Sequence, residues 1–497
     1  MKIVAAKTEL HDAPVVSAML GIGVLLAVPA TLYVVFSLWS DSLQRQIVAA
    51  AGLALLTLFT VLKRKLNALL LSLVFVTQCS ISLHSIPLAP PAIFQFFFID
   101  VLIVLLVMTA VERHETFRPD LAGWLLLTMA LWELFATIFS AHVDRSLLFV
   151  MWQLKYFVIY VLVRNLRISD ELLARLQYVV AAVLIIQSLL AFVQQLKGGP
   201  IGLNVLGEQD ASRLFFVRGD LRVSGTLGAT NGFGGYLAAM LCFLIPSVLT
   251  KRNVVIYAAV GVGTMALLFT FSRAGWLSLI IGAGISVLVM TRSRVLTWGR
   301  MVLLTFAGFL LLSVAIGAYY EKVIERFENK EAVGAAVGRF SQFYQAWPVI
   351  SRYPIVGIGP GVTEYYGAWN ENEKYIRQKL PDVRFGNQMH SAQLQYWIES
   401  GTPGFALFML LIVITGVTAF RRRASNDASE LMKLSSIGAG AAALAILIHS
   451  SFGPEINNYR ILICFVTFLA LARNLSSAKI NAESTAAKIP HPPANFL

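Results

Sequence analysis

Arginines set among glycines are the residues of this sequence best suited to chemistry. Arg213, Arg218 and Arg222 fall within ten residues, and Arg222 begins the string Arg-Val-Ser-Gly-Thr-Leu-Gly. A fourth arginine, Arg273, lies in Ser-Arg-Ala-Gly-Trp (272–276), which joins two apolar runs with almost no loop between them. Guanidinium groups stay ionised and match the geometry of phosphate, and glycines let the main chain approach a ligand. The pattern predicts a site for an anionic group, and the alternative is that these arginines contact lipid headgroups.

A histidine and two glutamates are candidates for proton transfer. His390 begins His-Ser-Ala-Gln-Leu-Gln-Tyr-Trp-Ile-Glu, which ends at Glu399 just before an apolar run. We expect His390 at or before a helix N-terminus, and neutral imidazole is the natural proton acceptor near pH 7. The alternative is a structural role, which is the commoner one for a lone histidine. His449 and Glu455 are further candidates, Glu455 as a base or a ligand of a sugar hydroxyl.

The sequence gives little support to metal or nucleotide chemistry. In the loops 196–230, 272–274, 320–402 and 452–459, no pair of Asp residues has the spacing found in metal-dependent, nucleotide-sugar transferases. Glu371 and Glu373 lie in a charged stretch that is typical of a solvated segment. No Walker motif, dinucleotide fingerprint or nucleophile elbow is present. We therefore predict a reaction that uses neither a metal nor a cofactor.

The composition decides what kind of fold must position these residues. Of 497 residues, 57% are hydrophobic and only 13% are charged, whereas soluble proteins carry about a quarter of their residues as charges. This excludes a soluble enzyme, a disordered scaffold and a disulfide-stapled domain. The net charge of +13 includes short clusters such as 63–65, 251–252 and 421–423, which indicate a cytoplasmic membrane face and not a nucleic-acid interface. The sequence predicts an all-α polytopic membrane protein surrounded by lipid.

A membrane-spanning helix needs about 20 mostly apolar residues. By this rule we predict about 14 transmembrane helices, at 15–39, 46–62, 67–87, 93–111, 121–140, 147–163, 178–195, 231–250, 253–271, 275–290, 301–319, 403–420, 434–451 and 460–473. Lys and Arg concentrate in alternate loops, which predicts that these loops and both termini are cytoplasmic. The opposite side then carries the loops 196–230, 272–274, 320–402 and 452–459.

The predicted organisation has five parts. They are N-terminal transmembrane helices (1–195), transmembrane helices with arginine-bearing outer loops (196–319), a large outer loop (320–402), C-terminal transmembrane helices (403–473) and a cytoplasmic tail (474–497). The large loop is expected to be partly helical, because apolar residues in 338–350 recur at helical spacing and predict a helix on the membrane surface. The segment 353–361, Tyr-Pro-Ile-Val-Gly-Ile-Gly-Pro-Gly, predicts a tight turn. Its glycines are compatible with a phosphate cradle or with plain loop punctuation.

The motifs, taken in order, resemble one family. Arg222-x-Ser-Gly-Thr, the 272–276 segment, Arg339 with the turn at 354–361, and His390 with Glu399-Ser-Gly resemble the O-antigen ligase and O-antigen polymerase superfamily, which are bacterial inner-membrane glycosyltransferases. The similarity covers roughly residues 200–420. It depends on the order and spacing of the motifs around one long outer loop.

The resemblance implies a glycan donor carried on undecaprenyl diphosphate and an active site that faces the periplasm. It implies that Arg222 and Arg273 match the family's diphosphate-binding arginines and that His390 matches its essential loop histidine. The acceptor would be another glycan, a lipid A core or a protein hydroxyl. Further candidates for substrate binding are Arg213, Arg218, Arg339, Glu399 and Glu455. The family usually has about twelve spans, fewer than the fourteen predicted here.

The competing hypothesis is a polysaccharide flippase or another secondary transporter. Transporters usually place polar sites at the middle of the bilayer, on broken helices. In this sequence only Asp100, Glu133 and Lys155 are expected within the membrane, and the other polar candidates concentrate on one side. That asymmetry favours catalysis at the interface over transport.

Overall fold

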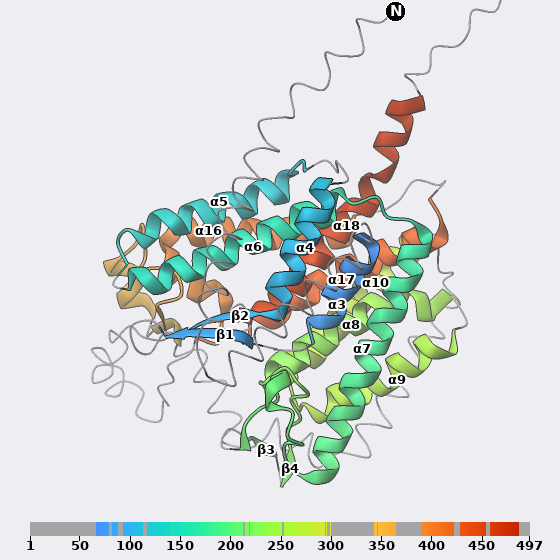
Figure 1. The fold of residues 1–497 in the computed structure, drawn as a ribbon, viewed down its shortest axis with the longest axis horizontal. Coiled ribbons are helices and arrows are strands. Elements are labelled where there is room, and N and C mark those ends of the chain that lie inside the picture. Colours follow the sequence, from blue (N-terminus) through green and yellow to red (C-terminus); the bar gives the residue numbers. More distant parts are fainter. Residues whose placement is uncertain are drawn as a thin grey trace, which may run out of the picture. The chain divides into compact units, whose positions relative to one another are not determined.

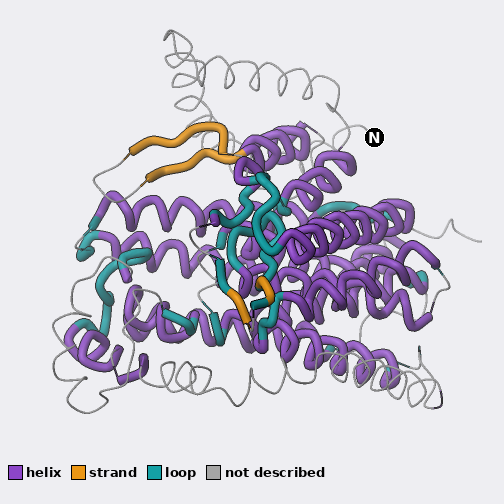
Figure 2. Tube along the Cα trace, turned by 90° about the horizontal axis from the view of Figure 1, so that it is seen from below, coloured by secondary structure: helices purple, strands orange, loops and turns teal. Residues whose placement is uncertain are grey.

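The computed structural model of the protein describes residues 66–78, 82–87, 93–112, 117–140, 142–211, 214–217, 219–250, 253–293, 295, 299, 342–344, 346–363, 389–421, 428–453 and 458–486. The chain divides into two compact units, Met1–Val76 with Ser80–Phe117 and Thr77–Cys79 with Arg118–Leu497. The described parts are mainly helical, with strands in two short hairpins (Figure 1, Figure 2). The predicted spans at 15–39, 46–62 and 301–319 lie outside the described residues.

In the first unit, two of the predicted membrane spans are wrong in part, because strands replace a portion of each predicted helix. Its described elements are α3 (Leu66–Val76), β1 (Ser82–Pro87), β2 (Ile93–Phe97) and α4 (Phe98–Glu112), and β1 pairs antiparallel with β2. The predicted spans 67–87 and 93–111 are therefore each part helix and part strand. The polar string Ser-Leu-His-Ser-Ile-Pro and the prolines after it end the helical run, and Ile-Phe-Gln-Phe-Phe favours a strand.

The second unit is a helical assembly. Its helices are α5 (Leu121–Thr137), α6 (Val143–Asn165), α7 (Asp170–Lys197), α8 (Thr230–Thr250), α9 (Val254–Phe269), α10 (Arg273–Arg292), α16 (Ala392–Phe420), α17 (Glu430–Ser450) and α18 (Tyr459–Ala486). Within the described ranges, seven helices are long and apolar enough to cross a membrane, while α5 and α9 are apolar but shorter. The protein is therefore a multi-pass membrane protein, and the predicted spans between 121 and 290 and between 403 and 473 coincide with helices.

Two boundaries differ from the sequence prediction. Helix α16 begins at Ala392, eleven residues before the predicted span, because Ser391 caps it by accepting from the Leu394 N–H at 3.4 Å. Helix α18 continues to Ala486, into the predicted tail. The connection between α7 and α8 contains the short turn Asn204–Leu206 and a hairpin of β3 (Phe216–Val217) and β4 (Asp220–Leu221), which Figure 1 labels near the bottom of the view.

Helices α8, α17 and α18 form the buried centre of this unit, where small residues allow close packing. Helix α17 contacts α8, α10 and α18. A Cβ added to Gly438 of α17 would lie 2.3 Å from the Phe243 main-chain oxygen of α8. Small residues let apolar helices approach within van der Waals contact, which is the main source of helix association in lipid.

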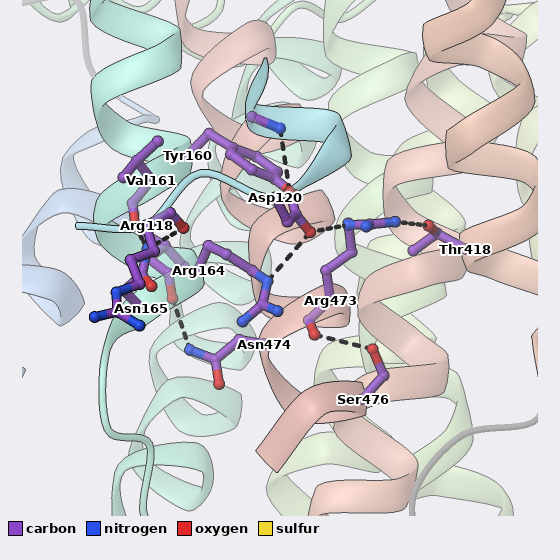
Figure 3. A network of polar contacts seen from close by, with 12 residues as sticks. Arg118, Asp120, Tyr160, Val161, Arg164, Asn165, Thr418, Arg473, Asn474 and Ser476 are labelled. Atoms are coloured by element: carbon purple, nitrogen blue, oxygen red, sulfur yellow. Dashed lines mark hydrogen bonds and ion pairs between the residues drawn. The ribbon is translucent and has the colours of Figure 1, made fainter. Parts of the chain in front are cut away.

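A charged cluster joins four segments at one end of this unit, which we call the Asp120 end (Figure 3). The Asp120 carboxylate accepts from Arg473 Nε at 2.5 Å, Arg164 Nε at 3.3 Å and the Tyr160 hydroxyl at 2.8 Å. Arg473 also donates to Thr418 Oγ1 at 3.2 Å. Burial alone would raise the pKa of the Asp120 carboxyl, but the charge and hydrogen bond of Arg473 hold this pKa below its ordinary value.

Candidate functional site

The loop that follows β4 fixes Arg222 against the turn between α9 and α10. The Arg222 Nε donates to the Thr270 main-chain oxygen at 2.9 Å, and its Nη2 donates to Asn231 Oδ1 at 2.8 Å. The Arg222 N–H donates to the Phe215 oxygen at 2.8 Å, so both main chain and side chain are held. Only 8% of the residue is exposed. We call this part of the second unit the Arg222 end.

Arg273 is the first residue of α10, directly after that turn. The turn is as tight as the sequence predicted, because α9 ends at Phe269 and Ser272 caps α10 by accepting from the Gly275 N–H at 3.3 Å. Phe271 has a φ of 49°, an unusual conformation for a bulky residue. Since Arg222 holds Thr270, three residues before Arg273, the structure brings these two predicted site residues to one turn.

Three residues that the sequence analysis missed build the loop after Arg222. The Gln194 side-chain oxygen accepts from the Gly225 N–H at 3.0 Å, and the Gln187 oxygen accepts from the Thr226 N–H at 3.1 Å. Arg460 Nη1 and Nη2 donate to the Thr226 and Leu227 main-chain oxygens at 2.8 and 2.7 Å. Arg460 is only 6% exposed. The loop is thus held by side chains of α7 and α18.

A sequence signal for the two glutamines was present. Gln187 and Gln194 are seven residues apart, so they lie two turns apart on the same face of α7, within or beside an apolar run. A polar amide on an apolar helix implies a partner in the protein interior. Arg460 offered a weaker signal, because an arginine at the start of a span is more often a headgroup contact.

His390 precedes the capping residue of α16, as the sequence predicted. The His390 N–H donates to Gln342 Oε1 at 2.9 Å, and the residue is half-buried. In the first turn of α16, Gln393 Nε2 donates to Ser451 Oγ at 2.7 Å, which ties this helix to the end of α17. The N-terminus of α16 is therefore fixed beside the C-terminus of α17.

Helix α8 connects the end of α17 to Arg273. His449 of α17 is buried, and a Cβ added to Gly235 of α8 would lie 2.7 Å from its ring. The neighbouring Gly234 packs against Ser272, the cap of α10, where an added Cβ would lie 2.8 Å from the Ser272 Cβ. The His390 segment is thus linked through the end of α17 and the start of α8 to Ser272, which precedes Arg273. The N-termini of α8, α10 and α16 lie along this path, and the positive ends of helix dipoles favour anions.

The glycine-rich turn pairs with a break in α16. Gly401 has φ 66° and ψ −172°, which interrupts α16 and exposes main-chain oxygens in the last helical turn before the break. The Ile358 and Gly359 N–H groups donate to the Ile398 and Glu399 main-chain oxygens, both at 3.0 Å. These two N–H groups therefore bind the protein itself, which leaves the segment a weaker candidate as a phosphate cradle.

Glu399 is buried at this break and holds the following residues. Its Oε1 accepts from the Thr363 N–H at 3.1 Å, the Thr363 hydroxyl at 2.5 Å and Gln395 Nε2 at 3.2 Å. Glu133 of α5 is buried nearby, close enough to interact electrostatically with Glu399. These contacts give Glu399 a structural task, and its predicted role in substrate binding remains a prediction.

The remaining predicted site residues Arg213, Arg218, Arg339 and Glu455 lie outside the described residues. Within the described part of the chain, no group of three or more His, Cys, Asp or Glu side chains is arranged to hold a metal ion. The site that is described consists of buried or half-buried arginines, helix N-termini and the His390 segment. Such a set suits an anion with several oxygens and an adjacent proton transfer.

Comparison with known proteins gives a match over the centre of this site. A family model described as O-antigen ligase matches residues 256–409, from the first turn of α9 to the second half of α16. This match supports the resemblance of the chain to the O-antigen ligase and polymerase superfamily. No curated protein matches the chain.

The O-antigen ligase match covers Arg273, His390 and Glu399, and Arg222 lies before it. Arg222 is nevertheless joined to the matched region through its hydrogen bond to Thr270. A match to this family suggests a glycosyltransferase-like enzyme of surface glycan biosynthesis, whose partners in general are lipid-linked glycans and membrane lipids.

Proposed function

We propose that this protein is a glycosyltransferase of the bacterial inner membrane that transfers or polymerises a glycan from undecaprenyl diphosphate onto an acceptor hydroxyl. The active site faces the periplasm, and the reaction uses no metal. The observation that carries the proposal is that Arg222 bonds to the α9–α10 turn directly before Arg273, and that this turn is linked through α8 and α17 to the His390 segment.

The arginines have the chemistry that the leaving group requires. When the bond between the sugar C1 and the diphosphate oxygen breaks, its electron pair and a negative charge pass to the diphosphate. Arg222 and Arg273 stay ionised and can stabilise that charge, helped by the dipoles of α8 and α10. Removing one such contact is expected to slow the reaction about 10²–10³-fold.

His390 has the chemistry that the acceptor requires. As the acceptor oxygen forms its bond to C1, its proton passes to the His390 imidazole. A base in this position contributes about 10²–10⁴ in rate. A single displacement inverts the anomeric centre, so a nucleophilic carboxylate has no part in the reaction.

The proposal is tested by a glycan-transfer assay on purified protein in lipid vesicles. Arg222→Ala, Arg273→Ala and His390→Ala should each lower the rate at least 100-fold, with normal protein level and folding. Arg175→Ala is the matched control, because Arg175 pairs with Glu171 in an exposed position on α7. Rates near that of the unaltered protein for all three variants would refute the proposal, and net translocation of the lipid-linked glycan would favour the transporter.

The identity of the acceptor can be determined from the lengths of the surface glycans made by a strain that lacks the gene for this protein. Loss of long chains indicates a polymerase, whereas long chains that accumulate without attachment indicate a ligase. Transfer to protein serine or threonine gives glycosylated protein instead. The anomer of the product, read by NMR, tests the inversion independently.

A further inference from the structure

The helical segment 342–352 packs one of its faces against the protein. Residues 342–344 and 346–352 are helical, and the segment is drawn in amber beside α16 in Figure 1. Ala346, Val349 and Ile350 are buried in one cluster with Ile398 of α16. This face therefore has its partner within the chain.

Another face of this segment is aromatic and exposed. Phe343, Tyr344 and Trp347 are 44%, 66% and 50% exposed. Aromatic surface of this extent is costly in water, and Trp and Tyr are enriched where a bilayer meets water. The exposed residues that follow, Ser351 and Arg352, are polar. The aromatic part is thus limited to the first half of the segment.

Ring contacts connect this face to the second half of α16. The Phe343 ring stacks on Trp347 with centroids 6.0 Å apart, and Trp347 meets Trp397 edge-on at 6.3 Å. Trp397 in turn stacks on Phe405 at 4.6 Å, across the break at Gly401. An aromatic row therefore extends from the segment onto the membrane-spanning part of α16.

The row continues into a surface that lipid must cover. Beyond Phe405, α16 exposes an apolar stripe at helical spacing, formed by Met409, Leu410, Val413, Val417 and Phe420. Helix α16 is long and apolar enough to span a bilayer, so this stripe faces acyl chains. The exposed aromatic face is thus the continuation of a lipid-facing surface, which argues for lipid as its occupant.

We propose that Phe343, Tyr344 and Trp347 form a bilayer anchor that inserts between lipid headgroups at the Arg222 end. At that depth the rings leave water while the Tyr hydroxyl and the Trp N–H keep polar partners. The Gln342 side chain, at the start of the segment, accepts from the His390 N–H at 2.9 Å. The anchor therefore fixes the depth of His390 in the interface. This consequence for catalysis rests on the proposed function, but the existence of the anchor does not.

Spin labels on single cysteines test the anchor without any assay of activity. The three native cysteines are first replaced by serine, and a nitroxide is then placed by Tyr344→Cys or, as the matched control on the same segment, by Arg352→Cys, an exposed position that lies off the aromatic face of the helix. In phosphatidylcholine vesicles, the label at 344 should be more accessible to oxygen than to a nickel chelate, and the label at 352 should show the reverse. Equal accessibility profiles at the two positions would overturn the proposal.

A second measurement keeps the test decisive if the cysteine variants do not fold. Lipid brominated near the headgroup should quench part of the tryptophan emission, and Trp347→Phe should remove a share of the quenched signal. If Trp347→Phe leaves the quenched signal unchanged, or if iodide in water quenches Trp347 instead, the anchor is refuted. An intact anchor together with full glycan transfer by His390→Ala would refute only the proposed function.

Discussion

Gly401→Ala should detach the glycine-rich turn from α16. The Gly401 backbone, with φ 66° and ψ −172°, is in a region that non-glycine residues enter at a cost of about 1–3 kcal/mol. An added Cβ would lie 2.1 Å from the Ile355 main-chain oxygen, and main-chain atoms cannot move aside without moving the turn. The Thr402 N–H bond to the Pro354 oxygen at 2.8 Å is then lost with the two bonds from Ile358 and Gly359.

The size of the effect follows from these contacts. Each of the three hydrogen bonds contributes about 0.5–1.5 kcal/mol, so with the backbone cost the turn loses roughly 3–7 kcal/mol of local stability. A loss of about 3 kcal/mol corresponds to an opening about 100 times more frequent. Hydrogen exchange of peptides that cover 354–363 should therefore be at least 100-fold faster in Gly401→Ala.

Gly416→Ala is the matched control on the same helix. A Cβ at Gly416 would meet nothing within 4 Å, so this change should leave the exchange of 354–363 unaltered and stabilise the helix by up to about 1 kcal/mol. The same exchange rate in Gly401→Ala as in the unaltered protein would show that the break in α16 does not hold the turn, and the reasoning would be refuted.

Two further variants test other parts of the structure. Asp120→Asn should lower the free energy of unfolding by about 1–3 kcal/mol at pH 7, because two guanidinium groups lose their carboxylate. Since the folded state lowers the Asp120 pKa, this stabilisation is present above the unfolded pKa of about 3.9 and is lost as the pH falls through the folded pKa. The free energies of unfolding of Asp120→Asn and of the unaltered protein, measured as a function of pH, should therefore converge below the folded pKa of Asp120. A difference between them that stays constant with pH would contradict the pairing. Arg460→Met should loosen the loop after Arg222 and lower glycan transfer about 100-fold at unchanged protein level, whereas Arg175→Ala should not.

Local features of the site could be predicted because they depend on neighbouring residues. Ser272 and Ser391 are side chains that cap helices, so the starts of α10 and α16 follow from short strings of sequence. The tight turn before Arg273 followed from the two long apolar runs on either side of it. The strand at Ser82–Pro87 was missed, because apolar composition was given more weight than the proline and polar residues.

The structural role of Glu399 could not be predicted from its position in the sequence. Its spacing from His390 was known, but its contacts with Thr363 arise only when the turn docks on the broken helix. The same holds for Gln194, whose partner Gly225 is 31 residues away. Spacing places a side chain on a helix face, and packing decides what that face meets.

The sequence by itself determined that this is a helical membrane protein with arginines and a histidine next to apolar segments, because hydropathy and helix capping are properties of short stretches of chain. Only the tertiary structure decided that Arg222 reaches the turn before Arg273 and that Arg460 holds the loop that follows Arg222. The physical reason is that hydrogen bonds between residues 48 and 234 positions apart form only when the helices that carry them have packed together.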